Sequence, residues 1–192
     1  MTKVALIKTG DRASGVVRGI DLLGINPVRG KHVTLKPNFN TADPAPGSTD
    51  NETLRSLILK LREMGVRGIT VAERSAPDTR ETMEAKGIFA LAEELGFELV
   101  NLHDLGEDSF VTIQPPGSHW QDGFLFPKLY QEAESIVETC CLKTHGHGGH
   151  FTLSLKLAVG MVPRAGNKLM REMHSSPHQR RMIAELNWPF KP

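Results

Sequence analysis

The amino-acid sequence predicts an α/β fold, with a largely parallel sheet covered by helices on both faces. The first observation is an alternation of short apolar segments with longer segments of helical spacing, which is typical of β-α-β units. The second is the length of 192 residues, which suits a single domain. The third is a composition with 39% hydrophobic and 23% charged residues, typical of a soluble globular chain. We therefore expect one α/β domain over residues 1–192.

The amino-terminal part of the chain predicts two strands with a helix between them. Residues 4–7 have the pattern of a short buried strand. Asp11 can cap the following helix, whose apolar residues recur at helical spacing until Gly24 ends it. Residues 32–35 predict a second strand, and residues 38–49 predict a loop because they are rich in Pro, Asn and Asp.

The same alternation continues through the middle of the chain. Thr49 and Glu52 have the spacing of a capping box, which predicts a helix that ends at Gly65. Residues 69–72 predict the third strand, and residues 81–95 predict a helix with a break near Gly87. Residues 97–100 then predict the fourth strand.

The second half is less regular. Residues 110–113 and 124–126 are expected to pair as short strands, and residues 135–139 predict a further core strand. The pattern of residues 151–159 is compatible with either a strand or a helix. Thr152 and Lys156 are four positions apart, so they share a face in both cases. Ser176, followed by a proline, predicts the start of a last helix that stops at Trp188.

Composition and cysteine usage exclude several classes of protein. The formal net charge of +1 argues against a nucleic-acid binder and against a polybasic membrane binder. Cys140 and Cys141 are adjacent, and neighbouring α carbons, about 3.8 Å apart, are too close for an ordinary disulfide. We interpret both as buried structural thiols, although their role stays open. Without a signal-peptide core or a long apolar segment, the expected location is cytoplasmic, with no membrane association.

Polar side chains follow the predicted strands at their carboxyl ends. Ligands of open parallel sheets bind at this edge, so we expect the side chains to converge there on a small anionic molecule. The predicted substrate-binding residues are Lys36, Asn38, Glu73, Arg74, Ser75, Thr144 and Thr152, and the predicted catalytic residues are His145, Lys143 and Lys156.

A loop rich in histidine and glycine over residues 143–150 has three interpretations. His145, His147 and His150 could supply nitrogen ligands to a divalent transition metal, and the glycines would let the rings converge. The loop could instead bind an anion through successive backbone N–H groups, with Lys143 and Lys156 as counter-charges. A third interpretation is a polar loop without a ligand.

The segments around these residues resemble the domain-of-unknown-function-362 family. The resemblance runs through residues 4–8, Leu35–Asn38, Val71–Ser75, Leu142–His145 and Leu153–Lys156. That family is bacterial and archaeal and largely uncharacterised, and many members carry an additional ferredoxin-like cysteine segment. This chain has only two cysteines, so we expect no intrinsic iron–sulfur cluster. Family members commonly continue beyond the position of Pro192, which implies that the domain is C-terminally truncated here.

Two functions of different classes follow from these observations. In the first, the chain is an enzyme, or the substrate domain of an enzyme, that acts on a small anionic metabolite. This hypothesis includes versions with and without a metal or a metal cofactor. The chain also has a looser similarity to the nickel-pincer-dependent lactate racemases, in which a histidine is followed along the chain by a lysine. Here these residues would be His145 or His147 and then Lys156, and the similarity implies isomerase-like proton transfer. In the second, a non-catalytic binding or electron-transfer module serves an iron–sulfur partner. A protein partner or a homo-oligomer also stays open.

Overall fold

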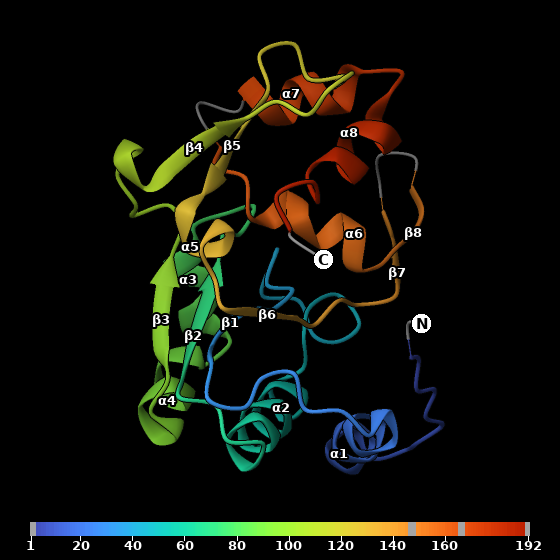
Figure 1. The fold of residues 1–192 in the computed structure, drawn as a ribbon, viewed down its shortest axis with the longest axis vertical. Helices are drawn as coiled ribbons and strands as arrows, with labels where there is room; N and C mark the ends of the chain where they lie inside the picture. The colour runs from blue at the N-terminus through green and yellow to red at the C-terminus, as the bar shows by residue number, and fades with distance from the viewer. Residues whose placement is uncertain (1–2, 146–148, 165–167, 191–192) are drawn as a thin grey trace.

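A four-stranded parallel sheet forms the centre of the computed structural model, which describes residues 3–145, 149–164 and 168–190. The strand order is β3-β2-β1-β6, and every neighbouring pair is parallel (Figure 1). The strands are β1 (His32–Lys36), β2 (Gly68–Glu73), β3 (Glu98–Asn101) and β6 (Ser135–Glu138). With helices around this sheet, the predicted α/β class is confirmed.

The central strands are buried because both faces of the sheet are covered. Leu35 of β1 lies opposite Val71 of β2 and Val137 of β6. Leu35 and Val71 are fully buried, as expected for the apolar middle of a parallel sheet. This register brings the carboxyl ends of β1 and β2 to one edge, where Lys36 and Glu73 end their strands.

Four helices precede the second half of the fold: α1 (Arg12–Leu23), α2 (Asn51–Glu63), α3 (Thr79–Ala85) and α4 (Ile88–Leu95). Helices α1, α2 and α4 lie in a row along one side of the sheet (Figure 1). Leu54, Ile58 and Leu61 of α2 pack there in the core formed with β1 and β2. Burial of this apolar stripe holds α2 against the sheet.

Helix boundaries follow local capping chemistry. Asp11 accepts hydrogen bonds from two amides at the start of α1, and Gly24 ends the helix with φ 61°, as predicted. Gly87, with φ 68°, separates α3 from α4, which confirms the predicted break. The cap of α2 is Asp50 and not Thr49, because the Asp50 carboxylate accepts from the amides of α2 while the Thr49 hydroxyl faces the sheet edge.

The second half of the chain forms a layer beyond the edge of the sheet at which the parallel strands end. Strands β4 (Phe110–Ile113) and β5 (Phe124–Pro127) pair antiparallel, as predicted. The remaining elements are η1 (Glu107–Ser109), α5 (Lys128–Gln131), β7 (Lys143–His145), β8 (Gly149–Thr152), α6 (Ser154–Leu157), η2 (Ala158–Gly160), α7 (Lys168–Ser175) and α8 (Gln179–Glu185). A second apolar core, which includes Trp120, Phe126, Met161 and Met173, joins them.

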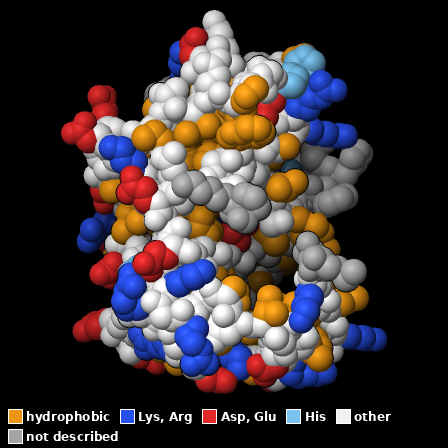
Figure 2. Space-filling view, viewed as in Figure 1, with side chains coloured by type: hydrophobic (Ala, Val, Ile, Leu, Met, Phe, Trp, Pro, Cys, Tyr) orange, Lys and Arg blue, Asp and Glu red, His pale blue; other side chains and the backbone are white. Residues whose placement is uncertain are grey.

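Side chains of different kinds gather on the two halves of the molecule. Figure 2 shows hydrophobic side chains over the upper part of this face, around β5, α8 and the carboxyl-terminal segment. Charged side chains dominate below, around α1 and α2. In the described part of the chain, no helix combines the length and the apolar character that crossing a bilayer requires.

Two further local predictions were wrong. Residues 4–7 form no strand: they pair with none of the four strands of the sheet, and Val4 and Leu6 are 87% and 94% exposed. Ser176 does not cap a helix: its hydroxyl accepts from the His178 amide, and α8 begins only at Gln179. Helix α7 was not predicted. Residues 151–159, for which a strand and a helix were the two alternatives, contain part of each. Strand β8 ends at Thr152, and helix α6 begins at Ser154.

Candidate functional site

A cavity of about 70 Å³ lies where the carboxyl ends of β1 and β2 meet the β7–β8 hairpin and α6. This is the position at which open parallel sheets bind their ligands. The polar residues that line the cavity are Lys36, Asn38, Asn40, Glu73, Arg74, Lys143, His145, Thr152 and Lys156. The structure thus brings together most of the predicted site residues, from elements up to 120 positions apart in the sequence.

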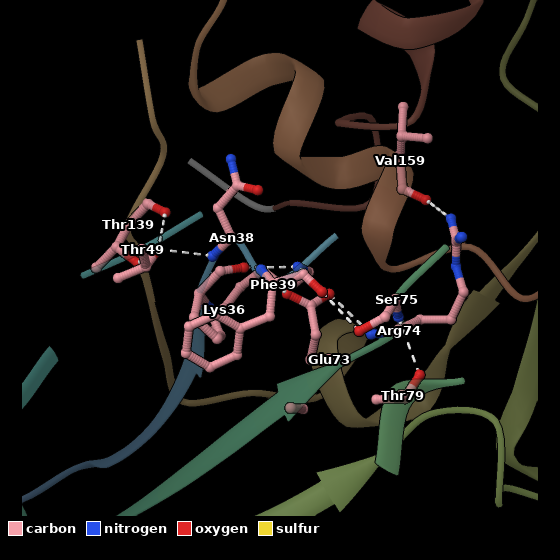
Figure 3. A network of polar contacts seen from close by, with 12 residues as sticks. Lys36, Asn38, Phe39, Thr49, Glu73, Arg74, Ser75, Thr79, Thr139 and Val159 are labelled. Atoms are coloured by element: carbon pink, nitrogen blue, oxygen red, sulfur yellow. Dashed lines mark hydrogen bonds and ion pairs between the residues drawn. The ribbon is translucent and has the colours of Figure 1, made fainter. Parts of the chain in front are cut away.

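The floor of the cavity is a buried ion pair. Lys36 Nζ lies 2.5 Å from Glu73 Oε1, and both side chains are 1% exposed. Lys36 also donates to the carbonyl of Pro37, whereas Glu73 accepts from the backbone amides of Phe39 and Arg74 at 2.7 and 2.8 Å (Figure 3). Burial lowers the pKa of Lys36, and the Glu73 carboxylate partly offsets this effect. Every polar group of the pair therefore has a partner.

Arg74 connects the sheet to the segment after α6. Its Nε donates to the carbonyl of Val162 at 2.9 Å, and its Nη2 donates to the carbonyl of Val159 at 2.5 Å (Figure 3). The side chain is 4% exposed, and burial lowers its pKa, although a guanidinium stays charged in proteins. Arg74 thus contributes its charge to the cavity while it fixes the cavity wall.

Gly160 closes over the ion pair, and sequence reasoning missed it. A Cβ at this position would lie 2.9 Å from Lys36 Nζ and 3.1 Å from Glu73 Oε1. Only a glycine permits the backbone of η2 to approach the pair so closely. Asn40, the other lining residue not predicted, follows Asn38 by two positions, so the same polar run after β1 could have indicated it.

The loop after β1 is fixed by hydroxyl groups. The Asn38 amide donates to Thr49 Oγ1, which also hydrogen-bonds to Thr139 Oγ1 at 2.9 Å. The Ser75 hydroxyl donates to the carbonyl of Phe39 at 2.6 Å, and Ser75 is fully buried (Figure 3). Ser75 was predicted to bind substrate, but the structure places it behind the cavity as a support for this loop.

Strand β7 carries alternate residues to the cavity. Lys143 and His145 line it, whereas Thr144 between them is exposed, because successive side chains of a strand point to opposite faces. Lys143 Nζ donates to the carbonyl of Gly47 and, at 3.4 Å, to Asn38 Oδ1. Thr144, a predicted substrate residue, is thus not among the lining residues.

Lys156 differs from the other three cations of the cavity. It is half-buried on α6, and within the described part of the chain its ammonium group has no hydrogen bond or ion pair. Burial, together with the positive charges of Arg74, Lys143 and Lys36, lowers the pKa of Lys156 to about 8. Thr152, predicted to share its face, lines the same cavity and donates to the Cys141 carbonyl.

The predicted metal ligands fall mostly outside the described residues. His147 lies outside them, and so does the side chain of His150. The ring centroid of His145 lies 6.5 Å from that of His174. Among the residues that the structure describes, no group of three or more His, Cys, Asp or Glu side chains is arranged to hold a metal.

The two cysteines differ from the predicted buried thiols. Both are free, Cys140 is exposed, and Cys141 is partly exposed. They follow β6 at the carboxyl edge, where the chain leaves the sheet for β7, so they contribute little to either core.

Comparison with known families agrees with the sequence resemblance. A family model described as Domain of unknown function (DUF362) matches residues 33–192, which include every residue of the cavity. The chain belongs to the DUF362 family. No match to this DUF362 chain was found among curated proteins, and none among solved structures. What the domain does therefore has to be argued from the cavity itself.

Proposed function

We propose that this DUF362 domain binds a small anionic metabolite in the cavity at the carboxyl ends of β1 and β2. The observation that carries the proposal is an imbalance of charge. Four cations line the cavity, and the one carboxylate among its lining residues, Glu73, is already bound to Lys36 and to two backbone amides. Clustered cations with low-dielectric walls attract an anion.

Hydrogen-bond capacity divides the cations into two groups. Lys36 and Arg74 already donate to Glu73 and to backbone carbonyls, so they act on a ligand mainly through charge. Lys143 belongs to the same group, because it donates to the carbonyl of Gly47. Lys156 has all three ammonium donors available among the described residues, and the side-chain amides of Asn38 and Asn40 add neutral donors. A carboxylate or a phosphate accepts such bonds most strongly.

The chemistry that we propose beyond binding is proton transfer on the bound anion. With a pKa of about 8, Lys156 is neutral in about one molecule in ten at pH 7, which lets it exchange protons near neutrality. His145 lines the same cavity and is the second candidate for the proton transfer, because imidazole titrates in this range. An isomerase-like reaction needs these two properties, an anion site and a group that accepts a proton.

Isothermal titration calorimetry with small anions tests the binding. Lactate, malonate and inorganic phosphate are titrated into the wild type, into Lys156→Ala and into Lys168→Ala. Lys168 is a matched control, because it is 66% exposed and paired with Asp122 on the surface. We expect at least one anion to bind, with an affinity at least tenfold weaker in Lys156→Ala and unchanged in Lys168→Ala. Equal affinity in all three proteins, or no binding at all, contradicts the proposal.

A further inference from the structure

Lys156 has the surroundings of a nucleophile as well as those of an anion-binding residue. The other cavity cations have fixed acceptors: Glu73 for Lys36, backbone carbonyls for Arg74, and the Gly47 carbonyl for Lys143. Lys156 has none in the described part of the chain, so its Nζ can approach a ligand without breaking a bond. Its position on α6, after Thr152, directs this one amine to the space that the cations surround.

The apolar part of the cavity wall favours the neutral form of the amine. Leu153, Leu157 and Val159 line the cavity beside the polar residues. Together with the three neighbouring cations, this desolvation gives the Lys156 amine a pKa of about 8. An ordinary lysine is neutral in on the order of one molecule in a few thousand at pH 7, compared with about one in ten here. Desolvation beside other cations is the arrangement that activates a lysine toward carbonyl groups.

We propose that Lys156 captures a small anionic carbonyl compound, a 2-oxo acid or an anionic aldehyde, as a covalent imine. This inference rests on the proposed function, because the anionic group has to occupy the same cavity. The carboxylate would be held by the positive charge of Lys36, Arg74 and Lys143, while the carbonyl carbon would face Lys156.

The reaction balances without a further reagent. The lone pair of neutral Lys156 Nζ attacks the carbonyl carbon, a C–N bond forms, and the carbonyl π electrons move to oxygen. That oxygen takes one proton from the nitrogen to give a carbinolamine. It then takes a second proton from solvent and leaves as water, while the nitrogen lone pair forms the C=N bond. The product is a protonated imine, whose positive charge remains next to the bound carboxylate.

The volume of the cavity limits the size of the compound. A cavity of about 70 Å³ takes about five to seven water-sized groups, at about 10–15 Å³ each. That space suits a compact 2-oxo acid such as glyoxylate or pyruvate. A short-chain oxo acid or aldehyde is therefore the substrate class that we propose for Lys156.

Reductive trapping tests the inference on the full chain. The protein is incubated with glyoxylate or pyruvate and sodium cyanoborohydride, whose hydride reduces the imine to a stable secondary amine. We expect one modification per chain by intact mass, located at Lys156 by peptide mapping. Lys156→Arg keeps the positive charge but forms no such imine, so it loses this modification, whereas Lys168→Arg keeps it. Circular dichroism verifies that both variants fold.

Competition separates this inference from the proposed function. Lactate carries the carboxylate but no carbonyl, so it should slow trapping at Lys156 if both compounds occupy the cavity. Binding of lactate without trapping at Lys156, or trapping spread over the exposed lysines, overturns the imine and leaves anion binding intact. If calorimetry also shows that none of the anions binds, the proposed function fails together with the imine.

Discussion

Lys36 and Glu73, at the carboxyl ends of neighbouring strands, form an ion pair 2.5 Å long that is almost completely buried. Such a pair is costly to break, because removal of one partner leaves the other as a buried unpaired charge. Around it, the backbone amides of Phe39 and Arg74 donate to Glu73, and the backbone at Gly160 leaves no room for a Cβ. The pair therefore holds the floor of the cavity in place, and the accessible cations are arranged above it.

The substitution Glu73→Gln should destabilise the fold strongly. It removes the negative charge opposite Lys36, which is expected to cost about 3–5 kcal/mol of unfolding free energy, measured by urea denaturation. Replacement of both partners, Lys36→Met with Glu73→Gln, should recover much of this loss because no unpaired ammonium remains at position 36. Glu94→Gln, in an exposed pair with Arg55, is the control and should change little. Equal effects of Glu73→Gln and Glu94→Gln would contradict the role of the pair.

The cations of the cavity could be predicted from the sequence, but their roles could not. Lys36 and its partner Glu73 end the apolar strands β1 and β2, and Lys143 follows β6 after a short segment. Parallel strands bring such positions to one edge of the sheet. The partners of Arg74 are carbonyls 85 and 88 positions away, and no local pattern indicates them. Sequence spacing placed Lys156 beside Thr152, but the fold as a whole decides that its ammonium group meets no partner among the described residues.

The wrong predictions have the same cause. Residues 4–7 have a strand pattern, yet a strand also requires a neighbouring strand to pair with, and this segment pairs with none of the four strands of the sheet. Thr49 has the spacing of a helix cap, but its hydroxyl is used by Asn38 and Thr139, and Asp50 caps the helix instead. Local propensity is overridden where a tertiary contact competes for the same group.

Gly160→Ala should reveal how closely η2 approaches the ion pair. The added methyl group would lie 2.9 Å from Lys36 Nζ, so the pair or the backbone must move. We expect a loss of about 1–3 kcal/mol in unfolding free energy, as for other overpacked sites. Gly106→Ala is the matched control, since a Cβ there meets nothing within 4 Å. Thermal unfolding of the two variants side by side tests the difference, and similar midpoints would disprove the close approach.

Arg74→Lys should loosen the wall of the cavity while it conserves charge. A lysine cannot reproduce the fork with which Arg74 holds the carbonyls of Val159 and Val162. We expect a loss of about 2–3 kcal/mol, with faster amide hydrogen exchange in residues 157–163. Arg80→Lys, in an exposed pair with Glu84, should change neither quantity. Unchanged exchange in residues 157–163 would contradict the connecting role of Arg74.

Lys156→Met should stabilise the unliganded protein near neutral pH, and the gain should depend on pH. The folded state lowers the pKa of Lys156 to about 8, whereas the unfolded chain keeps it near 10.5. Between these values the unfolded state binds more protons, so wild-type stability rises with pH through this window. Below pH 8 the charged amine penalises the folded state in full, by about 1–3 kcal/mol after solvent screening. Above about pH 10.5 the penalty is absent.

The difference between Lys156→Met and wild type isolates this group from the others that titrate. Arg74, Lys143, Lys36, His145 and Glu73 face the same cavity in both proteins, so their own titration largely cancels. We expect the advantage of Lys156→Met to be largest at pH 7 and to shrink between pH 8 and pH 10, as measured by urea denaturation. Saturating lactate should reverse the order at pH 7, because the bound anion stabilises only a protein that retains the ammonium group. An advantage that is constant with pH would show that the methionine acts through packing and that Lys156 carries no electrostatic penalty.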